Sequence, residues 1–409
     1  MARVAVAEPY VGLARCGARS ARARYGAAVI ERGRDYSWLP ERHLGIASTL
    51  AHADDLIDRA GDALFGYLKP PGPLRLKNVS DERTSYVTVA EVGPLPAAAS
   101  RYAADALTQL RAAIEHTLFA EVEHQLGRPL DAREAASIEM PAKEREADFS
   151  AWLRDRRRGQ LAPLQEGAPL VQRMRELQPY QQHDAQTHPL RVLAEHTNRA
   201  KHRTPAVAAT LLGAVMADVQ HPQLMLADVG AAADEKPVKT GDVLASGPLS
   251  VEIPLTIWPK VSIQRPHTGT WHVFMTELGE LEAWVRTIAV PTLAAGTHDV
   301  DPLPPQLDTT LGYEDVRAAL ITAGTVTARQ RAWRRILAGT FRIALVQVLT
   351  PLLKRPDVNL EGWAESLTDE EALERHDRLF AAQHDSKRVE SVLTGFVDEA
   401  TAATDWKNG

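Results

Sequence analysis

An unbroken stretch after Pro96, residues 97–125, constrains the fold of this chain more than any other feature. Its large apolar side chains recur at intervals of three and four residues, the spacing of one face of an α-helix. They are Leu107, Leu110, Ile114 and Leu118. A long helix with one apolar face must bury that face against other elements, so we expect a helical bundle around it and a mainly α protein.

Further helices are expected on both sides of this stretch. Residues 39–67 carry apolar side chains at helical spacing and are followed by Pro70-Pro71-Gly72-Pro73, which cannot continue a helix. Pro189 suits a first helical turn, so a helix should run from there to about His202. The other predicted helices are 131–139, 146–157, 166–177, 272–289 and several within 311–405.

Two parts of the chain alternate apolar and polar residues as β-strands do. Residues 86–92 predict a short strand. The run from Leu249 to Ile257 alternates strictly, and 260–264 predicts another strand after a break at Trp258-Pro259. We therefore expect a small antiparallel β-sheet near residues 238–272, inserted in the helical protein.

At 409 residues the chain is too long for one ordinary domain. Residues 300–310 contain Asp-Pro-Leu-Pro-Pro and are the best candidate for a linker. We expect an Arg/Ala-rich segment at 1–38, a helical domain with its β insertion at 39–299, and a C-terminal helical domain at 311–409.

Composition excludes several classes of site. Cys16 is the only cysteine, which excludes a disulfide framework and a Cys-based zinc site and fits a cytoplasmic location. The net charge of -6 gives no general attraction to nucleic acid or to an anionic membrane, so any such contact must be local. The longest apolar run, Ile343 to Leu353, is too short to span a bilayer, and we expect no membrane association. Phosphate-loop, dinucleotide and hydrolase-elbow motifs are absent, as are closely spaced metal-binding histidines, so no cofactor or metal is expected.

Two segments about ninety residues apart combine arginine with histidine on an expected helix. They are Leu110-Arg111-Ala112-Ala113-Ile114-Glu115-His116 and Asn198-Arg199-Ala200-Lys201-His202-Arg203. Gln178-Pro179-Tyr180 lies between them, and Trp271 opens a later helix. Together these elements resemble a group of bacterial all-helical proteins related to the HEPN superfamily, over about residues 40–295.

The resemblance implies a HEPN-like helical bundle and a metal-independent endoribonuclease of the toxin or phage-defence type. In that superfamily an Arg, followed after four to six residues by a His, acts across a dimer on RNA. The guanidinium holds a phosphate while the imidazole moves a proton. Arg111 with His116, or His202 with Asn198 and Arg199, would do this here in a homodimer. The alternative is a non-catalytic HEPN-like module that binds RNA, a nucleotide or a protein partner, with the C-terminal helices available for a protein.

The Arg/His spacing occurs about as often as chance predicts. The instances are Arg111/His116, Arg191/His196, Arg265/His272 and Arg378/His384. On a regular helix residues 111 and 116 lie about 140° apart, so they would need a distorted turn or a second protomer to act together. Arg111 and Glu115, four residues apart, are instead well placed to form an ion pair, which would make Arg111 a residue of helix packing.

The second segment has a more coherent polar face. Four polar residues share one side of the expected helix: Glu195, Asn198, Arg199 and His202. With Lys201 and Arg203 beside it, this face would bind a phosphate group. The alternative is a buried hydrogen-bonded network that joins two helices.

Overall fold

The computed structural model describes residues 33–202, 206–228, 235–249 and 251–408. Most of the predicted segment 1–38, with Cys16, lies outside these residues, as does Arg203. The described chain forms two compact units that divide between residues 329 and 330, in the first turn of α11 (Ala328–Leu349). The candidate linker 300–310 belongs to the first unit, because Leu303 and Leu307 are buried in its core. The mainly helical fold is confirmed.

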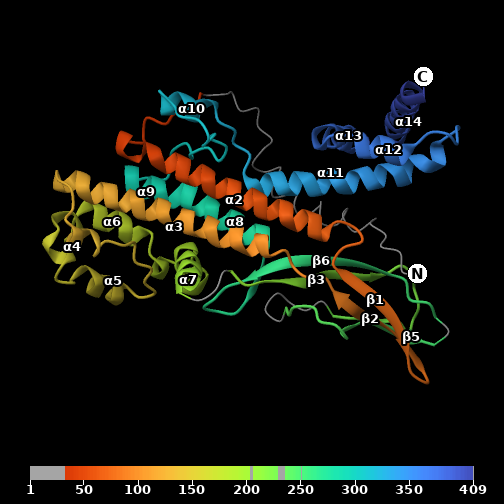
Figure 1. Cartoon of the computed structure of the whole chain (residues 1–409), viewed down its shortest axis with the longest axis horizontal. Coiled ribbons are helices and arrows are strands. Elements are labelled where there is room, and N and C mark those ends of the chain that lie inside the picture. Colours follow the sequence, from red (N-terminus) through yellow and green to blue (C-terminus); the bar gives the residue numbers. More distant parts are fainter. Residues whose placement is uncertain (1–32, 203–205, 229–234, 250, 409) are drawn as a thin grey trace. The chain divides into compact units, whose positions relative to one another are not determined.

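Four helices form the centre of the first unit. α2 (Leu44–Leu68) and α3 (Ala97–Leu126) lie side by side, and α8 (Phe274–Trp284) and α9 (Val290–Ala295) pack beside them (Figure 1). The four apolar residues of the predicted stripe on α3 are all buried in the core of this unit. The one-sided pattern of residues 97–125 therefore marks the contact face of the central helix.

Shorter helices surround these four. The α-helices are α4 (Ala132–Ala135), α5 (Glu146–Leu153), α6 (Pro169–Glu176), α7 (Pro189–His202) and α10 (Val316–Thr322). Single turns are η1 (Glu41–His43), η2 (Arg158–Gln160), η3 (Ala162–Leu164), η4 (Pro179–Gln181), η5 (Ala185–Thr187) and the π-helical η6 (Val285–Ala289). α7 has the predicted bounds, whereas the helix predicted at 131–139 shortens to four residues. The helix predicted at 272–289 begins at Phe274 and continues through η6 into α9.

The described residues form two antiparallel sheets rather than one sheet near 238–272. The first has the order β1 (Leu74–Ser80), β2 (Thr84–Val92), β5 (Val243–Pro248), β4 (Met225–Leu226). The second has the order β3 (Ala208–Ala217), β6 (Leu255–Gln264), β7 (Trp271–Val273). The prediction was wrong in extent because β2 and β3 pair with strands far along the chain, and local alternation carries no information about such partners.

Pro259 lies inside β6, where a break was predicted. It pairs with Leu212 of β3, next to an irregularity in the register between Leu212 and Ala214. Proline cannot donate a hydrogen bond to a sheet and is tolerated at such bulges. The bulge thus lets a ten-residue strand continue through a residue that would otherwise end it.

β6 contributes one of its faces to two different cores. Leu255 and Ile257 pack in a small core between the two sheets, with Val87 and Leu244 among the other members. Further along the same face, Val261 and Ile263 are buried in the helical core. The strand therefore connects the two sheets, which together we call the β-layer, to the helices of the first unit.

The second unit is a small helical bundle. It contains most of α11, the turn η7 (Thr350–Leu352), α12 (Leu360–Ser366), α13 (Asp369–Ala382) and α14 (Ser386–Asn408). Phe341, Leu345, Trp363 and Phe396 are buried in its core. Within the described residues one helical stretch, Ala328–Leu352, has the length and mean hydropathy of a membrane span. This is weak evidence, because core helices of soluble proteins pass the same test.

Candidate functional site

Arg111 and Glu115 form an ion pair on α3, as their spacing predicts. Both also hold the backbone of Met140: Arg111 donates to its carbonyl oxygen, and Glu115 Oε2 accepts from its N–H at 2.7 Å. Burial raises the pKa of Glu115 against the opposing effect of Arg111. This arrangement fastens the chain after α4 to the central helix, so the Arg111 guanidinium is engaged in packing.

The other predicted residues are spread over different surfaces. His116 is exposed on α3. On α7, Asn198, Lys201 and His202 are exposed. Glu195 pairs with Arg191 at 2.6 Å, and Arg191 also contacts Glu144 at 3.0 Å. The structure therefore pairs Arg111 with Glu115, and Glu195 with a residue outside the predicted face.

A second polar cluster lies where α7 meets the β6–β7 hairpin and α8. Arg265 donates both sides of its guanidinium fork to Glu277, at 2.7 and 2.8 Å, and His272 Nδ1 lies 3.8 Å from the same carboxylate. Glu277 is 2% exposed. Arg265 and His272 thus form an Arg/His pair in which both side chains approach the carboxylate of Glu277.

His196 of α7 is buried beside this cluster. Its pKa is lowered to about 4, chiefly by burial; the charge of Glu277 opposes this shift and the charge of Arg265 adds to it. Within the described residues, its Nε2 atom has no hydrogen-bond partner. At neutral pH the cluster therefore holds a neutral imidazole beside a carboxylate that Arg265 already binds through two hydrogen bonds, which suits a structural joint better than proton transfer.

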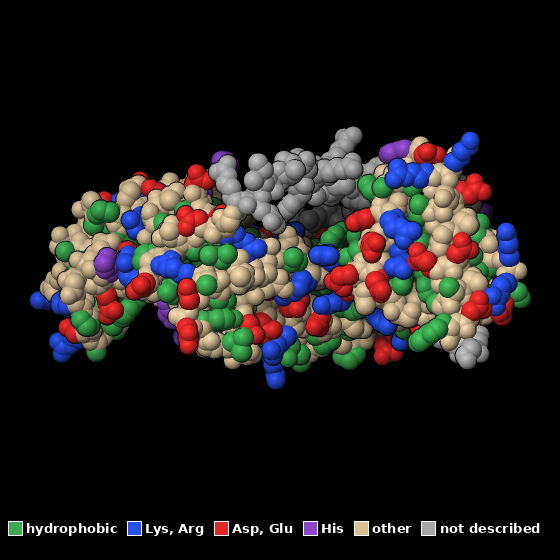
Figure 2. Space-filling view, turned by 90° about the horizontal axis from the view of Figure 1, so that it is seen from above, with side chains coloured by type: hydrophobic (Ala, Val, Ile, Leu, Met, Phe, Trp, Pro, Cys, Tyr) green, Lys and Arg blue, Asp and Glu red, His purple; other side chains and the backbone are tan. Residues whose placement is uncertain are grey.

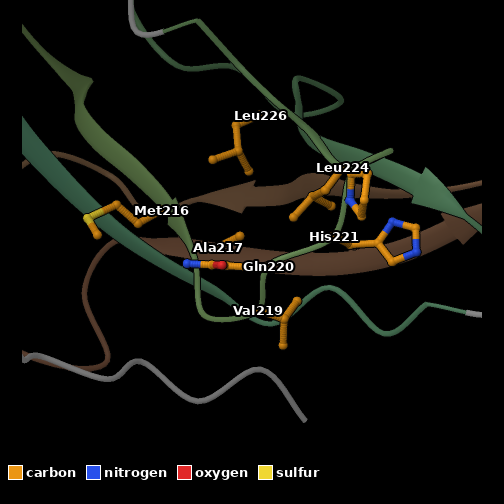
Figure 3. A pocket seen from close by; sticks show the side chains of 8 residues that line it. Met216, Ala217, Val219, Gln220, His221, Leu224 and Leu226 are labelled. Atoms are coloured by element: carbon orange, nitrogen blue, oxygen red, sulfur yellow. The ribbon is translucent and has the colours of Figure 1, made fainter.

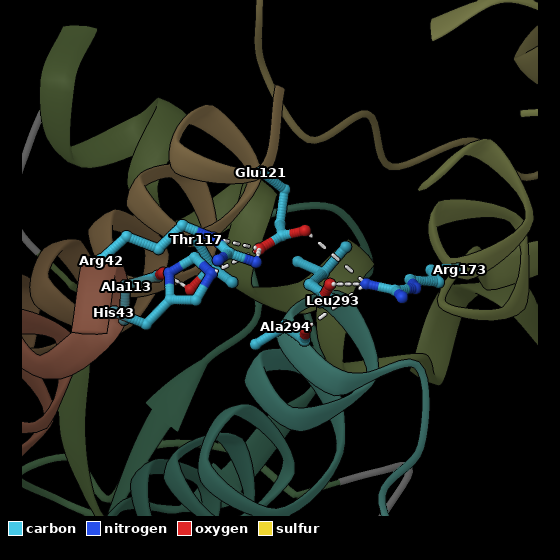
Figure 4. Close-up of polar contacts among 8 residues, drawn as sticks. All are labelled: Arg42, His43, Ala113, Thr117, Glu121, Arg173, Leu293 and Ala294. Carbon is cyan, nitrogen blue, oxygen red and sulfur yellow. Dashed lines mark hydrogen bonds and ion pairs between the residues drawn. The ribbon is translucent and has the colours of Figure 1, made fainter. Parts of the chain in front are cut away.

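Glu121 of α3 is the centre of a third cluster (Figure 4). Its Oε1 accepts from Arg42 at 2.6 and 2.8 Å and lies 2.7 Å from Nε2 of the fully buried His43. Arg173 approaches Oε2 at 3.7 Å and donates to the carbonyl of Leu293, near the end of α9. Burial of Glu121 opposes its ionisation, but the hydrogen bonds from His43 and Arg42 outweigh burial and lower its pKa. The cluster joins η1, α3, α6 and α9.

The β-layer contains an open groove, which we call the β3–β4 groove. It encloses about 730 Å³, and β3 lines one side while the chain returning to β4 lines the other (Figure 3). Its lining residues are Met216, Ala217, Val219, Gln220, His221, Pro222, Leu224 and Leu226. The lining contains no Asp, Glu, Lys or Arg, so an apolar, uncharged occupant fits it.

Exposed apolar side chains of the first unit gather around this groove and the rest of the β-layer. They are Val79, Met216, Val219, Met225, Leu226, Val243, Leu249 and Val273. Outside the β-layer, the described part of this unit exposes only Leu311 and Ile321 among its large hydrophobic residues. Met216, Val219 and Leu226 of this set line the groove itself, and exposed apolar surface around a groove commonly marks an interaction site. Met225 beside the groove is 70% exposed, the highest value among these residues.

The sequence offered only part of this picture. The groove escaped prediction because its lining combines the end of β3, an irregular loop and β4, and the loop has no periodicity to recognise. A usable signal was the group of apolar residues in Met216 to Leu226, where a polar loop would be ordinary. Comparison of this chain with protein-family models, curated proteins and solved structures found no match.

Proposed function

We propose that this chain is a non-catalytic, HEPN-like binding module whose β3–β4 groove holds an apolar, uncharged segment of a partner protein. The observation that carries the proposal is the groove itself, with its uncharged lining and its rim of exposed apolar side chains. The contrast with the three polar clusters supports it, because their carboxylates are already occupied by arginines.

The wider expectations from the resemblance remain part of the proposal. The HEPN-like assignment rests on the two Arg/His segments, which lie on α3 and, as far as His202, on α7, and we retain the homodimer with it. A second protein contact through the C-terminal helices is supported by Phe380 and by Trp406, which is 84% exposed.

Photo-crosslinking in cells tests the groove. A photoreactive amino acid in place of Met225 is expected to capture a partner protein. The same photoreactive amino acid in place of Val79, on the opposite edge of the sheet, is expected not to capture it. The captured protein should bind the purified chain. Leu226→Glu should weaken that binding at least about a hundredfold, because it would bury a carboxylate without a partner.

The matched control is Val79→Glu, which introduces the same charge on the same sheet away from the groove. It is expected to leave binding within about threefold of wild type. Both substitutions replace exposed side chains, so both variants should fold. Identical adducts from both positions, or an affinity insensitive to Leu226→Glu, would refute the proposal.

One observation favours an endoribonuclease as the second candidate. Arg265 and His272 have the Arg/His spacing of the superfamily and both approach Glu277. If this function is correct, expression of the wild-type chain should slow growth and degrade bulk RNA. His272→Ala should abolish both effects, and His116→Ala and His202→Ala test the residues predicted from the sequence. Equal toxicity of all four chains, or toxicity of none, would dismiss this candidate.

A further inference from the structure

Three arginines stand together on the turn between α5 and η2. Arg154, Arg156 and Arg157 are exposed, and among the described residues no carboxylate lies within ion-pair distance of any of them. Several other exposed arginines of the same unit are paired with carboxylates, as Arg128 is with Glu134 at 2.7 Å. We call these three residues the arginine turn.

The turn is held in place by its neighbour Arg158. The Arg158 guanidinium stacks 4.3 Å above the ring of the buried Trp152 and donates to the carbonyl oxygens of Trp152 and Ser137, at 2.9 and 3.0 Å. Asp155 accepts from the Arg157 N–H at 3.0 Å. Little backbone entropy is therefore lost when the arginine turn meets a ligand, which favours binding.

The overall charge of the protein gives no general attraction to anions. The chain carries a net charge of -6, and acidic and basic side chains are interspersed over the face seen in Figure 2. Attraction of a polyanion must therefore come from a local excess of positive charge. The arginine turn provides one.

We propose that the arginine turn binds the phosphate backbone of a nucleic-acid duplex. Guanidinium groups recognise phosphate oxygens through paired N–H donors. Among the described residues from 97 to 202 no large hydrophobic side chain is exposed, so the surface offers neither an aromatic platform for unstacked bases nor an apolar group to enter a bilayer. The contact is therefore with the backbone, and it is independent of base sequence. This site goes beyond the proposed function and does not depend on the groove.

The test uses the full chain and labelled 20-base-pair duplexes of RNA and of DNA, titrated at several salt concentrations. Wild type is expected to bind with a strong salt dependence, each neutralised phosphate adding about 0.9 to the slope of log K against log salt. Replacing Arg154, Arg156 and Arg157 by glutamine should lower that slope by about 2 to 3 and weaken binding at low salt at least tenfold. The RNA and DNA arms establish which duplex is preferred.

The matched control replaces three paired arginines, Arg59, Arg128 and Arg145, by glutamine. Both triple variants lose the same charge, so a difference between them reports position rather than net charge. Equal unfolding midpoints show that both are folded. Three results would overturn the proposal: no salt-dependent binding by wild type, equal losses in the two variants, or binding to vesicles of anionic lipid with none to either duplex.

Discussion

Replacing Arg286 with leucine is expected to lower the free energy of unfolding of the first unit by about 3–5 kcal/mol. Arg286 is 3% exposed and donates to Glu282 at 2.5 Å. It also donates to three backbone carbonyls, those of Leu50, Leu303 and Pro304, at 3.0–3.1 Å. Without the guanidinium, a buried carboxyl and three buried acceptors lose their donor, while the leucine regains little contact.

The pH dependence of this loss provides a sharper check. Burial raises the pKa of Glu282 to about 7; Arg286 opposes the shift and Asp54 adds to it. Removing Arg286 raises the pKa further, so at pH 5 Glu282 is already neutral, whereas at pH 8 the protein must hold a proton that the unfolded chain releases. The loss measured by urea unfolding should therefore be larger at pH 8 than at pH 5.

The control is the double variant Arg286→Leu/Glu282→Leu. It leaves no buried charge without a partner, so it should recover most of the stability lost in the single variant. A double variant as unstable as the single one would mean that the carbonyl contacts, rather than the ion pair, account for the effect. A loss below about 1 kcal/mol in the single variant would contradict the prediction outright.

Acidification from pH 6.5 to 4 is expected to remove about 3 kcal/mol of stability through His188 alone. Its Nδ1 accepts from the Leu190 N–H at 3.1 Å, at the start of α7, and its ring packs edge-on against Trp284. Burial lowers the pKa of His188 from 6.5 to about 4. The unfolded chain therefore takes up the proton first, and stability falls as pH falls through this window and levels off below it.

His188→Asn isolates this contribution. An asparagine oxygen can accept the same hydrogen bond at the start of a helix, but it does not titrate. The variant should lose about 3 kcal/mol less than wild type between pH 6.5 and 4. His196, which has a similarly lowered pKa, still titrates in the variant, so some acid sensitivity should persist. An NMR titration that places His188 near 6.5 would contradict the prediction.

Residue spacing along the sequence predicted the features that depend only on neighbouring residues of one helix. The buried stripe of α3, the bounds of α7 and the ion pair of Arg111 with Glu115 all follow from spacing along one helix. The prediction failed where one short motif occurs in more than one kind of structure. The Pro-rich segment 300–310 looks like a linker, but its carbonyls receive Arg286 inside the core.

The buried polar clusters depended mostly on partners that are distant in the sequence. Glu121 meets Arg42 and His43 across about eighty residues, and Arg286 reaches Leu50 across more than two hundred. No spacing rule for a helix or strand covers such separations. The sequence therefore identified polar residues on α3 and α7 without showing which of them form ion pairs inside the fold and which face solvent.

The register of β6 limits which insertions the sequence of this protein can accept. One added residue after Pro259 would turn Val261 and Ile263 to the opposite face and empty their places in the helical core, while Leu255 stayed in register. The length of this strand is therefore fixed by two cores at once. Val219 to Pro222 of the groove lining belong to neither core, so under the proposed function changes there would alter the choice of partner while the fold stays the same.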